Sequence, residues 1–151
     1  MSFLANLRGI ELELDVRGYK RHTDSFDMWC KCDFSLRSGQ WLNYWFKNDE
    51  TLTSWEIDNL RDSLGKLLEG RMKKPERIIC LEPDFDFTLY PGYKHRPESY
   101  EIESFVHEIK DIYVDWRVYF WDSGLSDNYI SLKLYRDDIK ALYEYLESVV
   151  S

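Results

Sequence analysis

The stretch IICLEPDFDFTLYP, at residues 78–91, raises the main question about this chain. It contains three closely spaced carboxylates, Glu82, Asp84 and Asp86. Closely spaced carboxylates occur in catalytic pairs and in metal sites. The hydrophobic residues that alternate with them are Phe85, Phe87 and Leu89. Alternation with a period of two directs successive side chains to opposite faces of a strand. The stretch therefore predicts a β-strand with an acidic face exposed to solvent.

The same alternation runs through most of the chain and predicts about eight strands. They are expected at residues 10–16, 28–36, 41–46, 77–81, 84–89, 99–105, 112–121 and 129–135. The turn-forming sequence RSGQ, at residues 37–40, separates two of them and favours antiparallel pairing.

Two segments carry hydrophobic residues at helical spacing, one after each run of strands. The first begins at a capping box of Thr53 and Glu56 and ends at Gly70. The second ends the chain and starts at Asp137 or Asp138. Its expected buried stripe consists of Ile139, Leu142, Tyr143, Leu146 and Val150. Together these patterns predict an α+β fold: a mainly antiparallel sheet, arranged as a sandwich or an open barrel, with two covering helices.

Length and composition indicate a single domain that covers residues 1–151. Hydrophobic residues make up 44% of the chain and aromatic residues 17%, which is enough for a large core and excludes a disordered chain. The N-terminus lacks the long apolar stretch of a signal peptide. No run approaches the length that a membrane helix needs. We therefore expect a soluble, cytoplasmic protein.

The formal net charge is −8, which argues against a nucleic-acid-binding or membrane-binding protein and favours a basic partner. Moderate acidity also serves solubility alone, so charge by itself does not select a function.

No motif for catalysis or cofactor binding is present: the chain lacks GxGxxG, a P-loop, HExxH and GxSxG. The three cysteines, Cys30, Cys32 and Cys80, are expected to be buried free thiols, and no fourth ligand at zinc spacing accompanies them. The histidines, His22, His95 and His107, have no second ligand type nearby. We therefore expect no catalytic residue, no metal and no cofactor.

Aromatic residues on the outward faces of the strands are the strongest functional signal. Exposed aromatics beside carboxylates are typical of protein–protein contact sites. The alternative is that the two helices cover most of them. The candidate partner-binding residues are Glu82, Asp84, Asp86, Trp41, Trp45, Tyr119, Trp121, Asp122 and Tyr129.

The order of several segments resembles the WapI immunity family of bacteria over residues 10–150. These segments are GQWLNYW at 39–45, WEIDNLRDSLGKLLEG at 55–70, LEPDFDFTLY at 81–90, WDSGLSDNYISLKL at 121–134 and DIKALYEYLESV at 138–149. The most specific element is E-P-D-x-D-F at residues 82–87. The loop at residues 91–99 has no obvious counterpart in the family.

The resemblance implies a small protein that protects a cell against the toxic C-terminal domain of a large secreted, contact-dependent toxin. It implies no catalytic residue. The implied partner is a basic toxin domain, a nuclease, and the protein itself is expected to be a monomer or weak homodimer. Two other interpretations stay open: a β-rich domain that binds a small molecule, and a homo-oligomeric structural or adaptor protein.

Overall fold

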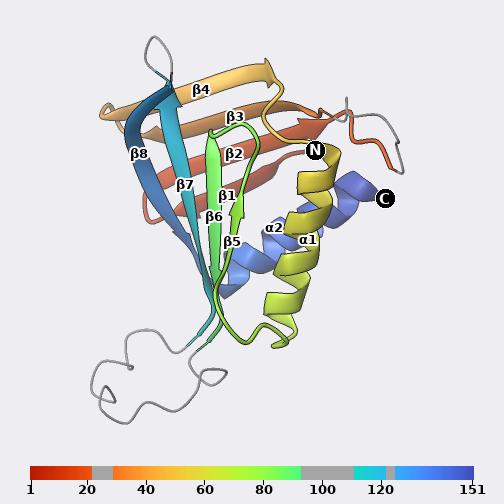
Figure 1. Cartoon of the computed structure of the whole chain (residues 1–151). Coiled ribbons are helices and arrows are strands. Elements are labelled where there is room, and N and C mark those ends of the chain that lie inside the picture. The colour runs from red at the N-terminus through yellow and green to blue at the C-terminus, as the bar shows by residue number, and fades with distance from the viewer. Residues whose placement is uncertain (22–28, 93–110, 122–124) are drawn as a thin grey trace, which may run out of the picture.

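The computed structural model (Figure 1) describes residues 1–21, 29–92, 111–121 and 125–151. Within these residues the chain forms two antiparallel sheets of four strands, and in each sheet the strands pair in chain order. The first sheet consists of β1 (Phe3–Leu7), β2 (Ile10–Arg17), β3 (Lys31–Ser38) and β4 (Leu42–Asp49). The second consists of β5 (Glu76–Ile79), β6 (Phe85–Tyr90), β7 (Tyr113–Trp121) and β8 (Leu125–Leu134). The helices are α1 (Ser54–Leu68) and α2 (Arg136–Val150).

The predicted α+β class is confirmed, and both sheets are open rather than closed into a barrel. Strand β1 was not predicted, because Leu4 interrupts its alternation. The turn to β2 was also missed: Arg8 and Gly9 have φ values of 54° and 94°, as a two-residue hairpin turn requires. The strand predicted at residues 99–105 lies outside the described residues.

The two sheets pack face to face, and the strands of one cross those of the other in Figure 1. Their inner faces meet in a cluster of aromatic rings. The ring centroids of Phe34 on β3 and Phe85 on β6 are 4.9 Å apart. The ring centroid of Trp116 on β7 lies 5.2 Å from that of Phe85 and 5.8 Å from that of Phe34. Trp116 is completely buried, so this aromatic cluster is the centre of the core.

The helices α1 and α2 lie side by side across one open end of the sandwich (Figure 1). Gly65 permits this approach, because a Cβ atom there would lie 3.0 Å from the ring of Tyr143. Tyr143 was predicted to be buried, but it is half-buried, and Tyr145 takes its place in the core. The Tyr145 hydroxyl accepts a hydrogen bond of 2.8 Å from the Val16 amide. Neither helix, nor any other in the described part of the chain, is long and apolar enough to span a membrane.

The predicted capping box at the start of α1 is present. The Thr53 hydroxyl accepts a hydrogen bond of 3.1 Å from the Glu56 amide, and Glu56 Oε1 accepts one of 2.9 Å from the Thr53 amide. The other oxygen, Oε2, accepts a hydrogen bond of 2.5 Å from the amide of Leu81, just after β5. The carboxylate of Glu56 is buried, and through these two oxygens it connects the start of α1 to the second sheet.

We expect Trp116→Ala to lower the free energy of unfolding by about 3–5 kcal/mol, because it removes the central ring of the core and leaves a cavity. Urea denaturation measures the change. Trp45→Ala, at an exposed position, is the matched control and should stay within about 0.5 kcal/mol of the unchanged protein. Equal losses for the two variants would contradict this view of the core.

We expect Glu56→Gln to lower the free energy of unfolding by about 1–3 kcal/mol. The glutamine side chain has one acceptor oxygen where glutamate has two. Its NH₂ group must therefore face the backbone N–H of Thr53 or Leu81, and that donor loses its hydrogen bond. Thermal and urea unfolding measure the loss. Glu69→Gln, at the exposed end of α1, is the control and should change stability by less than about 0.5 kcal/mol.

Candidate functional site

The structure separates the predicted contact residues into three groups. Trp41 and Trp45 belong to the first sheet, and Tyr119 and Tyr129 point outward from the second. The third group lies around β6: Glu82 and Asp84 come just before this strand, Asp86 lies within it, and Trp121 ends the neighbouring strand β7. Asp122 lies outside the described residues. A single contact patch therefore does not contain them all.

The expectation that the acidic face of residues 84–89 is exposed to solvent is wrong. Asp86 is only 5% exposed, because β6 is an inner strand of its sheet and long side chains from both neighbours flank it. Arg77 on β5 forms an ion pair of 2.5 Å with Asp86, and Arg117 is the residue opposite it on β7. The carboxylate is thus occupied within the sheet.

Asp84 is also buried, at 7% exposure, and accepts a hydrogen bond from the indole N–H of Trp121. Burial raises the pKa of Asp84, and the nearby charges of Glu82 and Asp49 act in the same direction. Asp84 and Trp121, two of the predicted contact residues, are therefore hydrogen-bonded to each other, and Asp84 offers little surface to a partner. Glu82 is half-buried.

Tyr119 and Tyr129 stand opposite each other on β7 and β8, with ring centroids 5.2 Å apart. The Arg117 guanidinium lies over the ring of Tyr129, 4.7 Å from its centroid. This outer face of the second sheet therefore combines aromatic rings with cations, and it carries the carboxylates Asp86, which pairs with Arg77, and Asp115, which stands opposite Lys133.

Trp41 and Trp45 are the most exposed of the predicted aromatic residues, with 68% and 54% of their surface exposed. Trp41 lies in the turn before β4, where its indole N–H donates to the Ser38 hydroxyl over 3.0 Å. Trp45 points away from the core, because its neighbours Tyr44 and Phe46 turn inward toward the second sheet.

The outward side of strands β1–β4, which we call the β1–β4 outer face, is hollowed beside Trp45. A hollow of about 370 Å³ is lined by Leu4, Ala5, Asn6, Glu11, Leu12, Glu13, Ser35 and Arg37. A second hollow of about 240 Å³ is lined by Ser2, Glu13, Asp15, Asp33, Phe34, Ser35, Arg37, Trp45, Phe46 and Lys47. They share Glu13, Ser35 and Arg37, so they form one continuous depression across the strands.

Carboxylates outnumber cations in the lining of these hollows. The carboxylates are Glu11, Glu13, Asp15 and Asp33, and the cations are Arg37 and Lys47. Leu4, which is 67% exposed, adds an apolar side chain at one end, as Trp45 does at the other. Sequence reasoning missed this depression because the unpredicted strand β1 forms one of its walls.

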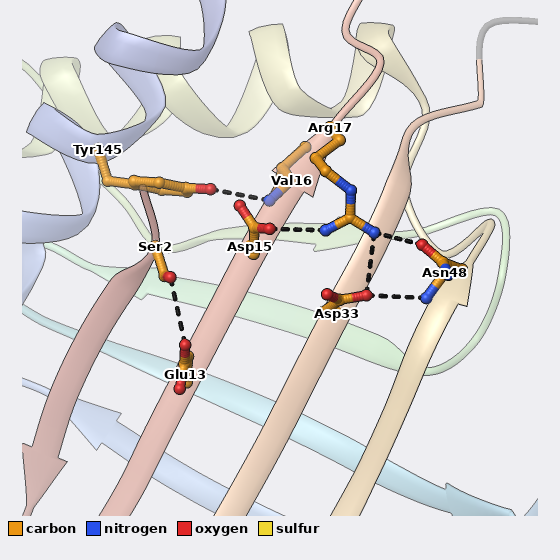
Figure 2. A network of polar contacts seen from close by, with 8 residues as sticks. All are labelled: Ser2, Glu13, Asp15, Val16, Arg17, Asp33, Asn48 and Tyr145. Atoms are coloured by element: carbon orange, nitrogen blue, oxygen red, sulfur yellow. Dashed lines mark hydrogen bonds and ion pairs between the residues drawn. The ribbon is translucent and has the colours of Figure 1, made fainter.

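A polar network closes one end of the β1–β4 outer face (Figure 2). Arg17 donates to Asp15 at 2.6 Å, to Asp33 at 3.0 Å and to the side chain of Asn48 at 2.5 Å. Asp33 also accepts from the Asn48 amide at 2.9 Å. The Arg17 guanidinium and this amide lower the pKa of Asp33. The network fixes β2, β3 and β4 relative to one another, so the hollow next to it has a defined shape.

The cysteines are buried free thiols, as predicted. Burial raises the pKa of Cys32 to about 12, which keeps this thiol protonated and unreactive at neutral pH. Among the residues that the structure describes, no group of three or more His, Cys, Asp or Glu side chains is arranged to hold a metal ion. The three histidines lie outside those residues.

An open depression edged by the exposed Trp45 and by carboxylates is a surface of the kind that binds another protein. The family model described as the Immunity protein WapI-like family matches residues 3–151, essentially the whole chain, so the chain belongs to this family. No curated protein matches the chain. The resemblance inferred from sequence is thereby confirmed. Membership gives the chain an immunity-protein role, implies a cognate toxin as its partner and indicates a non-catalytic function.

We expect Asp84→Asn to raise the free energy of unfolding at pH 7 by up to about 2 kcal/mol, because the amide keeps an acceptor for Trp121 and removes a buried charge. The raised pKa means that protonated Asp84 stabilises the fold at low pH and that this stabilisation is lost as the pH rises through that pKa. The gain from the substitution should therefore shrink as the pH falls toward about 3.9, the ordinary value for aspartate.

Urea unfolding at a series of pH values measures this difference. Asp62→Asn on α1, where the carboxylate is largely exposed, is the control and should change stability by less than about 0.5 kcal/mol at every pH. A loss of stability for Asp84→Asn at pH 7 would show that the ionised carboxylate, rather than the neutral group, is favoured at this position.

Proposed function

We propose that this protein neutralises a cognate, basic toxin domain with nuclease activity by docking on it through the β1–β4 outer face. The observation that carries the proposal is the depression that adjoins Trp45 and Leu4, lined by two cations and by four carboxylates, of which Asp15 and Asp33 pair with Arg17. Family membership supplies the immunity role and the existence of a toxin partner. The choice of surface, the basic charge of the toxin and its nuclease activity are the proposal's own content.

The charge of the chain supports a basic partner. A net charge of −8 speeds the encounter with a cationic protein and makes it sensitive to salt. Nuclease domains are basic because they must hold the phosphates of their substrate. An acidic protein that covers such a surface blocks the access of nucleic acid without any chemistry of its own.

The exposed tryptophans support the β1–β4 outer face as the toxin-binding surface. Tryptophan is enriched among the residues that dominate binding energy, since its large ring loses much water contact at little cost in conformational entropy. Trp45 stands beside a depression of defined shape, with Lys47 and Phe46 next to it in the lining. Trp41 extends the same side of the molecule at the turn before β4. The predicted contacts Asp84 and Asp86 are occupied within the second sheet and have no direct contact role in this proposal.

The proposal also places the protein in the cytoplasm, where a nuclease toxin would meet its substrate. Three unpaired cysteines support a reducing compartment, because such thiols are rarely left free in oxidising ones.

The test is a binding titration against a catalytically inactive form of the toxin C-terminal domain encoded immediately upstream in the source genome. We expect nanomolar affinity that weakens at least about tenfold between low and high salt. Trp45→Ala should weaken binding by about 2 kcal/mol, which is roughly thirtyfold. Glu13→Gln should mainly slow association.

Two controls separate the surfaces. Trp55→Ala removes an equally exposed tryptophan on α1 and should leave the affinity unchanged. Tyr129→Ala tests the outer face of the second sheet. Binding that depends on Tyr129 and ignores Trp45 would move the contact to that face. If the toxin domain does not bind at all, the proposal fails, and a thermal-shift screen with small ligands becomes the next experiment.

A further inference from the structure

Strand β4 lies at the edge of the first sheet. Each sheet has two edge strands, β1 and β4 in the first and β5 and β8 in the second. Arg8, which follows β1, donates to the Lys133 carbonyl of β8 over 3.0 Å, so these two edges adjoin each other. Strand β5 has only four residues. Strand β4 has eight, and within the described part of the chain it pairs with β3 alone (Figure 1).

Little in β4 protects this edge. Natural proteins guard exposed edges with prolines, inward-pointing charges, bulges or very short strands. The sequence of β4, LNYWFKND, contains no proline and one lysine, Lys47. Its irregular part is confined to the end, where Asn48 has a φ of 55° and the register with β3 shifts between Cys32 and Phe34. From Leu42 to Phe46 the ladder is regular. This part can accept another strand.

The surroundings of the edge are acidic. Asp49 and Glu50 follow Lys47 at the end of β4 and are exposed. The ring of Tyr44 on β4 packs on that of Phe120 on β7, with centroids 4.9 Å apart, which places β4 beside the end of β7. Glu82 and Asp84 lie in the same region, since the charges of Glu82 and Asp49 both raise the pKa of Asp84. Three carboxylates that are not buried, Asp49, Glu50 and Glu82, thus stand near the edge with Lys47 and with Lys31, which pairs with Glu50 at 3.9 Å.

We propose that the free edge of β4 receives an extended, basic segment of the partner toxin domain as an added strand. This inference rests on the proposed function and specifies how the partner is held. Backbone hydrogen bonds to β4 would provide affinity, and side chains on alternate positions of the added strand would reach the β1–β4 outer face beside Trp45. Lysine and arginine in the segment would meet the carboxylates at the end of the strand.

The test is amide hydrogen exchange on β4, with and without the inactive toxin domain. Hydrogen-bonded and non-bonded pairs alternate along an antiparallel ladder, so every second amide between Asn43 and Lys47 points away from β3. In the free protein these amides should exchange freely. In the complex they should be slowed by at least about tenfold, in the same alternating pattern. A complex in which exchange at β4 does not change would overturn the edge inference and leave the proposed function standing. If no complex forms, both fail.

A pair of variants gives an independent readout. Asn43→Pro removes a backbone N–H at the regular part of the edge, and Asn43→Ala changes the side chain only. If the Asn43 amide is among those that exchange freely, proline should weaken binding at least about tenfold while alanine has little effect. Equal affinities for the two folded variants would contradict the inference. If the proline variant does not fold, the exchange pattern alone decides.

Discussion

The contact of Phe34, Phe85 and Trp116 is the centre of the interface between the two sheets. Each sheet consists of consecutive antiparallel strands, and such a layer is stable only when its apolar face is covered. Aromatic rings meet this need with large buried areas and with edge-to-face geometry, which adds about 0.5–1.5 kcal/mol per pair beyond burial. Because Trp116 touches rings from both sheets, the crossing of the layers is set at this point.

Glu56 provides the second constraint, and it is of a different kind. Its carboxylate caps α1 at one oxygen and holds the backbone after β5 at the other. A buried charge of this sort is tolerated because the amides around it satisfy its oxygens. The helix is therefore attached to the second sheet at a fixed point between β5 and β6, and the close approach of Gly65 to Tyr143 then aligns the two helices. Packing and polar contacts, among them this anchor, the Arg17 network and the hydrogen bond from Val16 to Tyr145, together hold the elements in place.

Much of this fold could be predicted from local patterns. Alternation located seven of the eight described strands, and the residue types at 53, 56 and 70 located the first helix with its cap and stop. The errors about the site share a cause: alternation tells which residues share a face but not what covers that face. Asp86 was expected in solvent because its cover, Arg77, comes from a neighbouring strand. The candidate contact residues were likewise grouped by type, whereas the pairing order distributes Trp45 and Tyr129 over different sheets.

The strict separation of the two sides of β2 has a consequence for how such a protein can diverge. Leu12, Leu14 and Val16 face the core, while Glu11, Glu13 and Asp15 face outward on the same eight-residue strand. Substitutions of the second set leave the first untouched. A duplicated gene could thus change what the outward side of the strand recognises by small steps, while the residues that face the core stay the same. Narrow specificity and a shared scaffold are compatible in this architecture for that reason.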